Sequence, residues 1–176
     1  KEREEELASN KKALLSFLVD RLEQIMQSEY NIAHDVRKAA LGSTQHNLKW
    51  TLEVALELKE QTESEHFKET VESITRVLNM TKKNNLSGNV DKDKLETESE
   101  IALANQVMVL QNASDEHLDV AEQFKMLIQI SPYISDFFNH NMIMVEDEAV
   151  KENRLNLLGQ IANFARVFAD FSQLVI

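Results

Sequence analysis

The amino-acid sequence predicts an all-α fold, a helical bundle of about six to eight helices. The chain of 176 residues holds only 3 Gly and 1 Pro, and strands joined by tight turns would need more of both. Its hydrophobic residues, 43% of the total, recur every three or four positions, as they do on the buried face of a helix. Short capping patterns separate these runs and mark where each helix begins.

The first 60 residues divide into three expected helices. Residues 1–30 form the first, and residues 32–41 form a second that Gly42 ends as its C-cap. The third runs from residue 43 or 44 to residue 60 and contains Trp50, the only tryptophan. Two roles for Trp50 stay open: packing in the core, or a platform for a base or a partner. The first helix has one apolar stripe, expected in the core, made of Leu14, Leu15, Leu18, Leu22, Ile25 and Met26.

Three further capping patterns follow along the chain. Thr62 with Glu65 has the spacing of a capping box and predicts that a fourth helix starts there. Thr97 with Glu100 has the same spacing and predicts the next helix. Residues 114–116, Ser-Asp-Glu, are expected to cap the one after it.

Between the fourth and fifth expected helices lies a polar segment, residues 82–90. It begins with Lys82 and Lys83, and Arg76, Lys92 and Lys94 are close to it in the sequence. This is the densest basic cluster of the chain. It is interpreted either as a solvated loop or as a contact for an RNA backbone, since phosphates attract such clusters.

The C-terminal third is predicted to be two helices joined by a short connection. Ser131 and Pro132 are expected to open the first of them, and residues 139–141 to end it. Met142 and Met144 are expected in the core. The acidic residues 146–148 then suit the start of a final, very apolar helix from Glu148 to about Leu174. Its expected buried face is Leu157, Leu158, Ile161, Phe164, Ala165, Phe168 and Phe171.

Composition restricts the function. The net charge of −11 is unusual for a nucleic-acid binder, so RNA would be met through a local patch or through unstacked bases. The chain has no Cys, no apolar run of about 20 residues and no signal peptide, which together predict a cytoplasmic location. No glycine-rich phosphate loop, no Ser-His-Asp order and no complete set of metal ligands occurs, so no catalytic residue and no metal site is predicted.

Residues 137–158 resemble the C-terminal signature of the bacterial-type glycyl-tRNA synthetase beta subunit, which ends in a DALR-type anticodon-binding domain. Residues 17–41 and 169–172 also resemble that subunit. The chain departs from the pattern at Lys151, where Arg is usual, and at the His140-Asn141 pair. The matching residues, in order, are Phe137, Phe138, Met142, Met144, Glu146, Asp147, Val150, Asn153, Arg154, Leu155, Leu157 and Leu158.

The resemblance implies a domain division and a function. Residues 1–60 would be an N-terminal helical segment packed on an anticodon-binding bundle of residues 61–176. The chain would recognise tRNA(Gly) for a two-subunit class II glycine–tRNA ligase and perform no chemistry itself. ATP and magnesium would belong to the separate alpha subunit, and this part would hold no cofactor. Its partners would be tRNA(Gly), the alpha subunit and the rest of the beta subunit, without membrane or DNA. The alternative is a non-catalytic helical scaffold or protein-interaction domain.

Candidate tRNA-binding residues follow from the joint between the last two helices and from the basic cluster. Arg154 is interpreted either as a base contact or as an ion-pair partner of Glu146, Asp147 or Glu148. Asn and His side chains suit base edges, whereas Lys suits phosphates. The full set of candidates is Asn153, Arg154, His140, Asn141, Lys151, Lys82 and Lys83.

Overall fold

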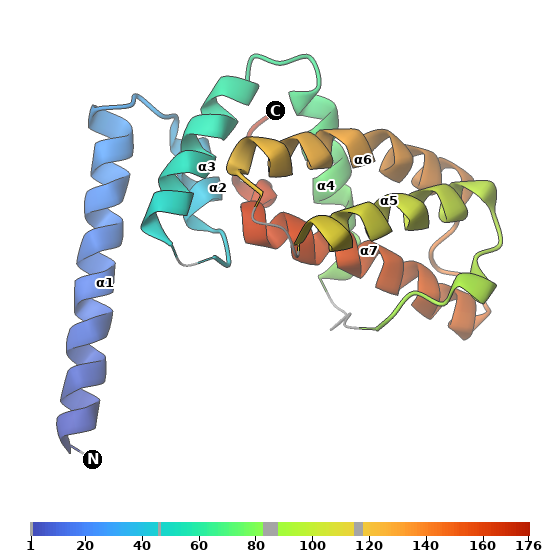
Figure 1. The fold of residues 1–176 in the computed structure, drawn as a ribbon, viewed down its shortest axis with the longest axis horizontal. Helices are drawn as coiled ribbons and strands as arrows, with labels where there is room; N and C mark the ends of the chain where they lie inside the picture. The colour runs from blue at the N-terminus through green and yellow to red at the C-terminus, as the bar shows by residue number, and fades with distance from the viewer. Residues whose placement is uncertain (1, 46, 83–87, 115–117) are drawn as a thin grey trace.

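The structure is a computed structural model that describes residues 2–45, 47–82, 88–114 and 118–176. Within these residues it contains seven α-helices, two 3-10 helices and no strand (Figure 1), which confirms the predicted all-α bundle. The helices are α1 (Glu2–Ser28), α2 (His34–Leu41), α3 (Leu48–Gln61), α4 (Phe67–Thr81), η1 (Lys92–Lys94), α5 (Glu98–Ser114), α6 (Val120–His140), α7 (Glu148–Phe168) and η2 (Phe171–Gln173).

Helices α4, α5, α6 and α7 form the main bundle. Helix α4 contacts α6 and α7, and α5 contacts the same two helices. Helix α3 packs on α6, while α2 packs on α3 and η2, so α2 and α3 are attached to the bundle. The boundary at residues 60 and 61 stays a prediction.

The core centres on Phe168. Its ring lies 5.6 Å from that of Phe124, 6.1 Å from that of Phe171 and 6.5 Å, edge-on, from the indole of Trp50. Three of these side chains are fully buried and Trp50 is 9% exposed, which confirms its packing role. Leu157, Ile161 and Phe168 are buried as predicted, but Phe164 is only partly buried.

Only the end of α1 contributes to this core. Leu22 and Met26 are buried against α2 and α3, whereas Leu14 and Leu15 are 58% and 51% exposed. The prediction of one buried stripe was therefore wrong for the first half of α1, because that half extends away from the other helices (Figure 1). Periodicity shows that a helix has an apolar face but not where a partner helix ends.

The capping patterns had mixed outcomes. The capping box of Thr97 and Glu100 is confirmed: the Glu100 N–H donates to Thr97 Oγ1 at 3.2 Å, and the Thr97 N–H donates to Glu100 Oε2 at 3.0 Å. The box at Thr62 is wrong, because α4 begins at Phe67 and the Thr62 hydroxyl donates to the carbonyl of Lys59 at 2.7 Å. A Thr hydroxyl can also donate to a carbonyl of the preceding helical turn, and it is then not available to cap the next helix.

Helix α6 ends at His140, within the predicted residues 139–141, but it differs from the prediction at its start and at Pro132. Residues 115 and 116 lie outside the described residues, and α6 begins after Asp119, which forms a capping box with Glu122. Pro132 does not open a helix but lies inside α6, where Ser131 Oγ donates to the Leu127 carbonyl at 2.7 Å. Packing of α6 against α4 and α5 keeps the helix continuous despite the missing proline N–H.

The connection between α6 and α7 has the opposite burial pattern to the one predicted. Met142 and Met144 are 75% and 63% exposed, and Ile143 between them takes the buried position. The core prediction for the two methionines was therefore wrong. Helix α7 starts as expected, because Asp147 caps it by accepting from the N–H groups of Ala149 and Val150. It ends at Phe168 instead of near Leu174, and η2 follows.

The C-terminal segment closes on α2 through Asp170. The Asp170 N–H donates to the Ala39 carbonyl at 2.9 Å, and Gly42 is the C-cap of α2, as predicted. Gly42 has an ordinary helical φ of −80°, so its requirement is space: a Cβ there would lie 2.5 Å from the Cβ of Asp170. Burial by itself raises the pKa of the Asp170 carboxyl, but hydrogen bonds from Ser172 and Gln173 and the charge of Lys82 outweigh it and lower the pKa below its ordinary value of 3.8.

This lowered pKa predicts how stability depends on pH. A group whose pKa is lower in the folded state stabilises the fold above its unfolded pKa and loses that contribution as the pH falls through its folded pKa. We therefore expect Asp170→Asn to unfold at lower urea concentration than the parent chain at pH 7, with the gap narrowing below pH 3.8. Urea titrations at several pH values measure this, with Asp20→Asn as control, because Asp20 is exposed on α1 and bonds to no described residue. A gap that does not change with pH would contradict it.

No helix in the described part of the chain is long and apolar enough to cross a membrane.

Candidate functional site

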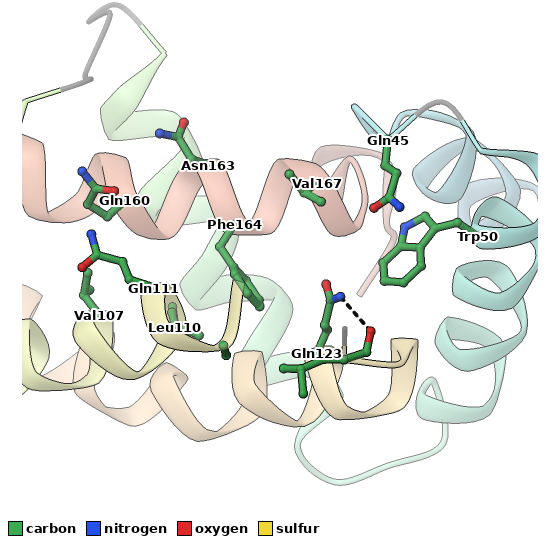
Figure 2. Close-up of a pocket in the computed structure, with 12 residues that line it drawn as sticks. Gln45, Trp50, Val107, Leu110, Gln111, Gln123, Gln160, Asn163, Phe164 and Val167 are labelled. Atoms are coloured by element: carbon green, nitrogen blue, oxygen red, sulfur yellow. Dashed lines mark hydrogen bonds between the residues drawn. The ribbon is translucent and has the colours of Figure 1, made fainter. Parts of the chain in front are cut away.

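A pocket of about 550 Å³ lies where α3, α5, α6 and α7 meet (Figure 2). Two aromatic side chains, Trp50 and Phe164, lie on its walls, and none of the described residues that line it carries a charge. Five of them are amides: Gln45, Gln111, Gln123, Gln160 and Asn163. The remaining lining residues are Val107, Leu110, Ala113, Leu118 and Val167. We call this cavity the amide pocket.

Helix geometry places these side chains together. Gln160, Asn163, Phe164 and Val167 are spaced at i, i+3, i+4 and i+7, so they share one face of α7. Phe164 points from α7 toward α5 and α6, while Trp50 faces it from α3 (Figure 2). This site was not predicted from the sequence. The signal for it is the position of the amides Gln160 and Asn163 beside Phe164, at the edge of the face expected to be buried.

Several polar groups of the amide pocket are not used by the described residues. Gln160 Nε2 donates to the Gly88 carbonyl at 3.1 Å and Gln123 Nε2 to the Leu118 carbonyl at 3.3 Å. The amide groups of Gln111 and Asn163 form no hydrogen bond with the described chain, and their side chains are exposed. The indole Nε1 of Trp50 is buried and also has no partner among the described residues. Each amide offers both a donor and an acceptor.

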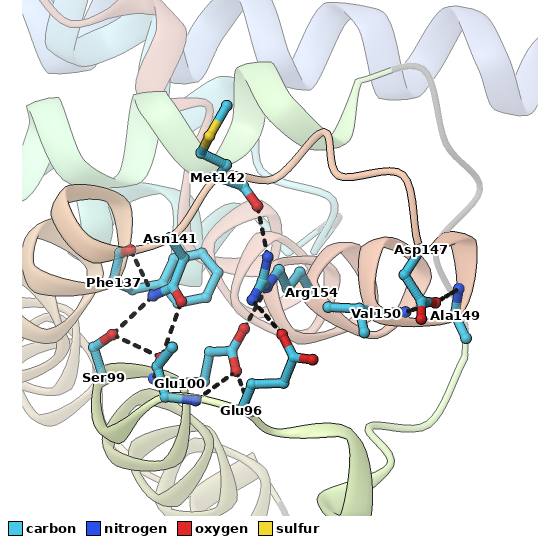
Figure 3. A network of polar contacts seen from close by, with 11 residues as sticks. Glu96, Ser99, Glu100, Phe137, Asn141, Met142, Asp147, Ala149, Val150 and Arg154 are labelled. Carbon is cyan, nitrogen blue, oxygen red and sulfur yellow. Dashed lines mark hydrogen bonds and ion pairs between the residues drawn. The ribbon is translucent and has the colours of Figure 1, made fainter.

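Arg154, a sequence-predicted site residue, lies inside the joint between α6 and α7 (Figure 3). Its Nε donates to Glu100, its Nη1 to the Met142 carbonyl at 2.7 Å, and its Nη2 to Glu96 Oε2 at 3.1 Å. Arg154 is 7% exposed and Glu100 is 1% exposed, so this ion pair is buried. The ion-pair interpretation is right in kind, but the partners come from α5 and the residues before it, not from residues 146–148.

Asn141 extends the same network. Its Nδ2 donates to Ser99 Oγ at 2.8 Å and to the Phe137 carbonyl at 2.9 Å, and its Oδ1 accepts from Thr97 Oγ1 at 2.9 Å (Figure 3). Asn141 is 7% exposed. It therefore ties the end of α6 to the start of α5.

Asn153 is buried too and binds the segment before η1. Its Oδ1 accepts from the Asp91 N–H at 2.7 Å, and its Nδ2 donates to the Asp91 carbonyl at 2.9 Å. Asn153 and Arg154 thus bind different parts of residues 91–100, as their adjacent places on α7 require. The structure brings Asn141 and Arg154 into one network and places Asn153 beside it.

The remaining candidates are more exposed. His140 Nδ1 lies 3.0 Å from Asp136 Oδ1, and the Lys151 ammonium lies 3.1 Å from Glu148 Oε2. Lys82 is exposed where α4 ends, and Lys83 lies outside the described residues.

The described basic residues near Lys82 have separate surroundings. The Arg76 guanidinium lies 4.1 Å above the ring of Phe138, and Lys94 pairs with Asp91 at 3.4 Å. Lys92 is exposed and makes no ion pair with a described residue. In the same described ranges, no group of three or more His, Cys, Asp and Glu is placed to hold a metal ion.

Comparison with known proteins places this geometry in a family. The model of the DALR anticodon binding domain matches residues 69–169, from α4 to the end of α7. The glycine–tRNA ligase beta subunit of Streptococcus mutans is 35% identical over 94% of the chain, and that of Lactobacillus delbrueckii subsp. bulgaricus is 36% identical over 96%. The chain spans about a quarter of the length of these relatives, 23% and 24%. The chain therefore belongs to the DALR anticodon-binding domain family and is homologous to the C-terminal part of the glycine–tRNA ligase beta subunit.

Proposed function

We propose that the chain recognises the anticodon loop of tRNA(Gly) for a two-subunit glycine–tRNA ligase in the cytoplasm. The observation that carries this proposal is the match of an anticodon-binding family to residues 69–169, nearly all of α4–α7, the part that forms the main bundle. Ligation of glycine to tRNA, with ATP and magnesium, is assigned to the alpha subunit. The rest of the beta subunit and the alpha subunit are then the protein partners.

A chain with this much negative charge can bind the anticodon loop only if most of its contacts are to bases and few are to phosphates. The net charge of −11 opposes broad contact with an RNA backbone. Anticodon bases are unstacked in a loop, so their edges and faces are free for recognition. Neutral donors and acceptors are therefore the groups to expect at the interface, with few lysines for phosphate contacts.

The candidate residues then take two roles in the proposal. Lys82 and His140 are exposed and Lys151 is half-buried beside Glu148, and these three are proposed to contact tRNA directly, as is Lys83. Asn141, Asn153 and Arg154 are buried and bonded to residues 91–100, so we assign them to positioning. They hold the joint and the segment before α5 in place, and variants of them should change affinity through the fold.

A binding experiment tests the proposal directly. The 176-residue chain is titrated with fluorescent glycine tRNA and with the same tRNA carrying a different anticodon. We expect weaker binding to the altered tRNA by about tenfold or more, the effect of losing one good base contact. Equal affinity for the two tRNAs would contradict the proposal that the chain recognises the anticodon. No binding to either at low salt would instead support the scaffold alternative.

Lys82 gives a prediction about the salt dependence. Lys82→Ala should weaken binding to both tRNAs by the same factor and reduce the slope of log K against log salt by about 1, because one phosphate contact is lost. Lys125→Ala, at an exposed lysine on α6, removes the same charge elsewhere and should leave the slope nearer that of the parent. Equal slopes for the Lys82 and Lys125 variants would contradict the proposal that Lys82 contacts the tRNA.

A further inference from the structure

We propose that the amide pocket binds one unstacked nucleobase of the tRNA loop. This inference rests on the proposed function and names its base-binding site. The pocket lies around Phe164, ten residues beyond Arg154 on α7, which corresponds to about 15 Å along the helix axis. The base-binding site is thus at the opposite end of α7 from the joint between α6 and α7.

The pocket offers the two kinds of contact that a base needs. Partly buried Phe164 supplies the aromatic surface, with the mostly buried Trp50 as a further wall, and base–aromatic stacking is a general means of holding unstacked bases. Gln111 and Asn163 supply donors and acceptors that no described residue uses. The edges of a base also combine donors with acceptors, and Asn and Gln pair with adenine at N6 and N7 through two hydrogen bonds.

The absence of charge on the described lining selects the type of ligand. A phosphate or an amine in the pocket would be desolvated without an opposite charge, which is costly. A neutral heterocycle carries no such cost. The cavity of about 550 Å³ is within the range of about 300–1,000 Å³ usual for small-molecule sites, so a base fits with room for water.

A second cavity indicates where the attached phosphate would lie. It has a volume of about 470 Å³ and shares Val107 and Gln111 with the amide pocket, so the two adjoin along α5. Lys92 is the charged residue on its described lining, and no described residue pairs with it. If a base occupies the amide pocket, Lys92 therefore lies where it can contact a phosphate of the attached RNA backbone.

The single tryptophan makes the test site-specific. A ¹⁵N-labelled chain gives one indole N–H signal, that of Trp50, and the probe is the anticodon stem-loop of glycine tRNA. We expect this signal to shift or broaden as the RNA is added. The double variant Gln111→Ala, Asn163→Ala should bind the RNA about tenfold or more weakly, as when one or two base contacts are lost.

Matched variants separate the pocket from general surface effects. Gln129→Ala removes an exposed amide of α6 that does not line the pocket and should bind like the parent chain. Lys92→Ala should bind more weakly than Lys125→Ala, since both remove an exposed lysine but only the first borders the adjoining cavity. Backbone amide spectra of each variant verify that the fold is kept, and the two single variants replace the double one if it unfolds.

The outcomes distinguish this inference from the proposed function. If the stem-loop binds but the Trp50 signal is unchanged and the amide variants bind normally, the pocket assignment is wrong while tRNA binding stands. If the RNA binds without anticodon preference and the Trp50 signal still changes, the pocket holds a base from elsewhere in the RNA. If neither the stem-loop nor glycine tRNA binds, both proposals fail.

Discussion

Replacing Arg154 with alanine is expected to lower the free energy of unfolding by about 3–5 kcal/mol, the usual cost of removing one partner from a buried ion pair. Glu100 is 1% exposed, and in the variant its buried carboxylate has no guanidinium partner. The Met142 carbonyl also loses the hydrogen bond from Arg154. The joint between α6 and α7 should then open together with the start of α5. Urea unfolding followed by circular dichroism measures the change.

Two further variants show whether the buried pair is responsible. Glu96→Gln should cost far less, because the Glu96 side chain is 58% exposed and exposed ion pairs contribute about 0–1 kcal/mol. The double variant Arg154→Ala, Glu100→Gln removes both charges and should recover part of the loss. With the single variants Arg154→Ala and Glu100→Gln it completes a double-mutant cycle, which quantifies the interaction. A loss below about 1 kcal/mol for Arg154→Ala would mean that the network contributes little to stability, contrary to the range for buried pairs.

Phe168→Ala should destabilise the chain by a similar amount, about 3–5 kcal/mol, because it leaves a cavity in a fully packed site. Phe168 is 0% exposed, and its ring contacts those of Trp50, Phe124 and Phe171 from three different elements. The midpoint of urea unfolding reports the loss. The Trp50 fluorescence should shift as well, because the two rings are in edge contact.

Phe164→Ala is the matched control for this second prediction. It makes the same substitution one turn earlier on α7, but Phe164 is partly buried and borders the amide pocket. Its loss should be clearly smaller, and its larger effect should be on RNA binding. Equal destabilisation by the two variants would place Phe164 in the core and reduce the space available for a base.

Much of the fold could be predicted because helix formation is mostly local. The scarcity of Gly and Pro and the spacing of apolar residues predicted an all-α chain, and seven α-helices occur in the described residues. The capping box of Thr97 and Glu100 was correct because both groups lie within one turn. The errors at Thr62 and Pro132 arose where a neighbouring turn or a packed helix outweighed the local pattern.

The candidate site was less accessible to sequence reasoning. Asn153 and Arg154 were chosen for their side-chain chemistry, but their bonding partners, Asp91 and Glu100, are 62 and 54 residues away. No pattern near α7 indicates these partners. Burial of a polar side chain depends on which elements meet, so it could not be deduced from the residue types.

Three features could be predicted from local sequence, because each depends on residues close together in the chain: the helical class, the joint near residues 139–147 and the family signature. Other features became known from the packed structure: Arg154 is buried with Glu100, Met142 and Met144 are exposed, and the first half of α1 lies free of the bundle. The packed structure alone also brought Gln111, Trp50 and Phe164 to one cavity. These features depend on how distant helices pack, and packing is set by the combined shape of several apolar faces and not by the period of any one.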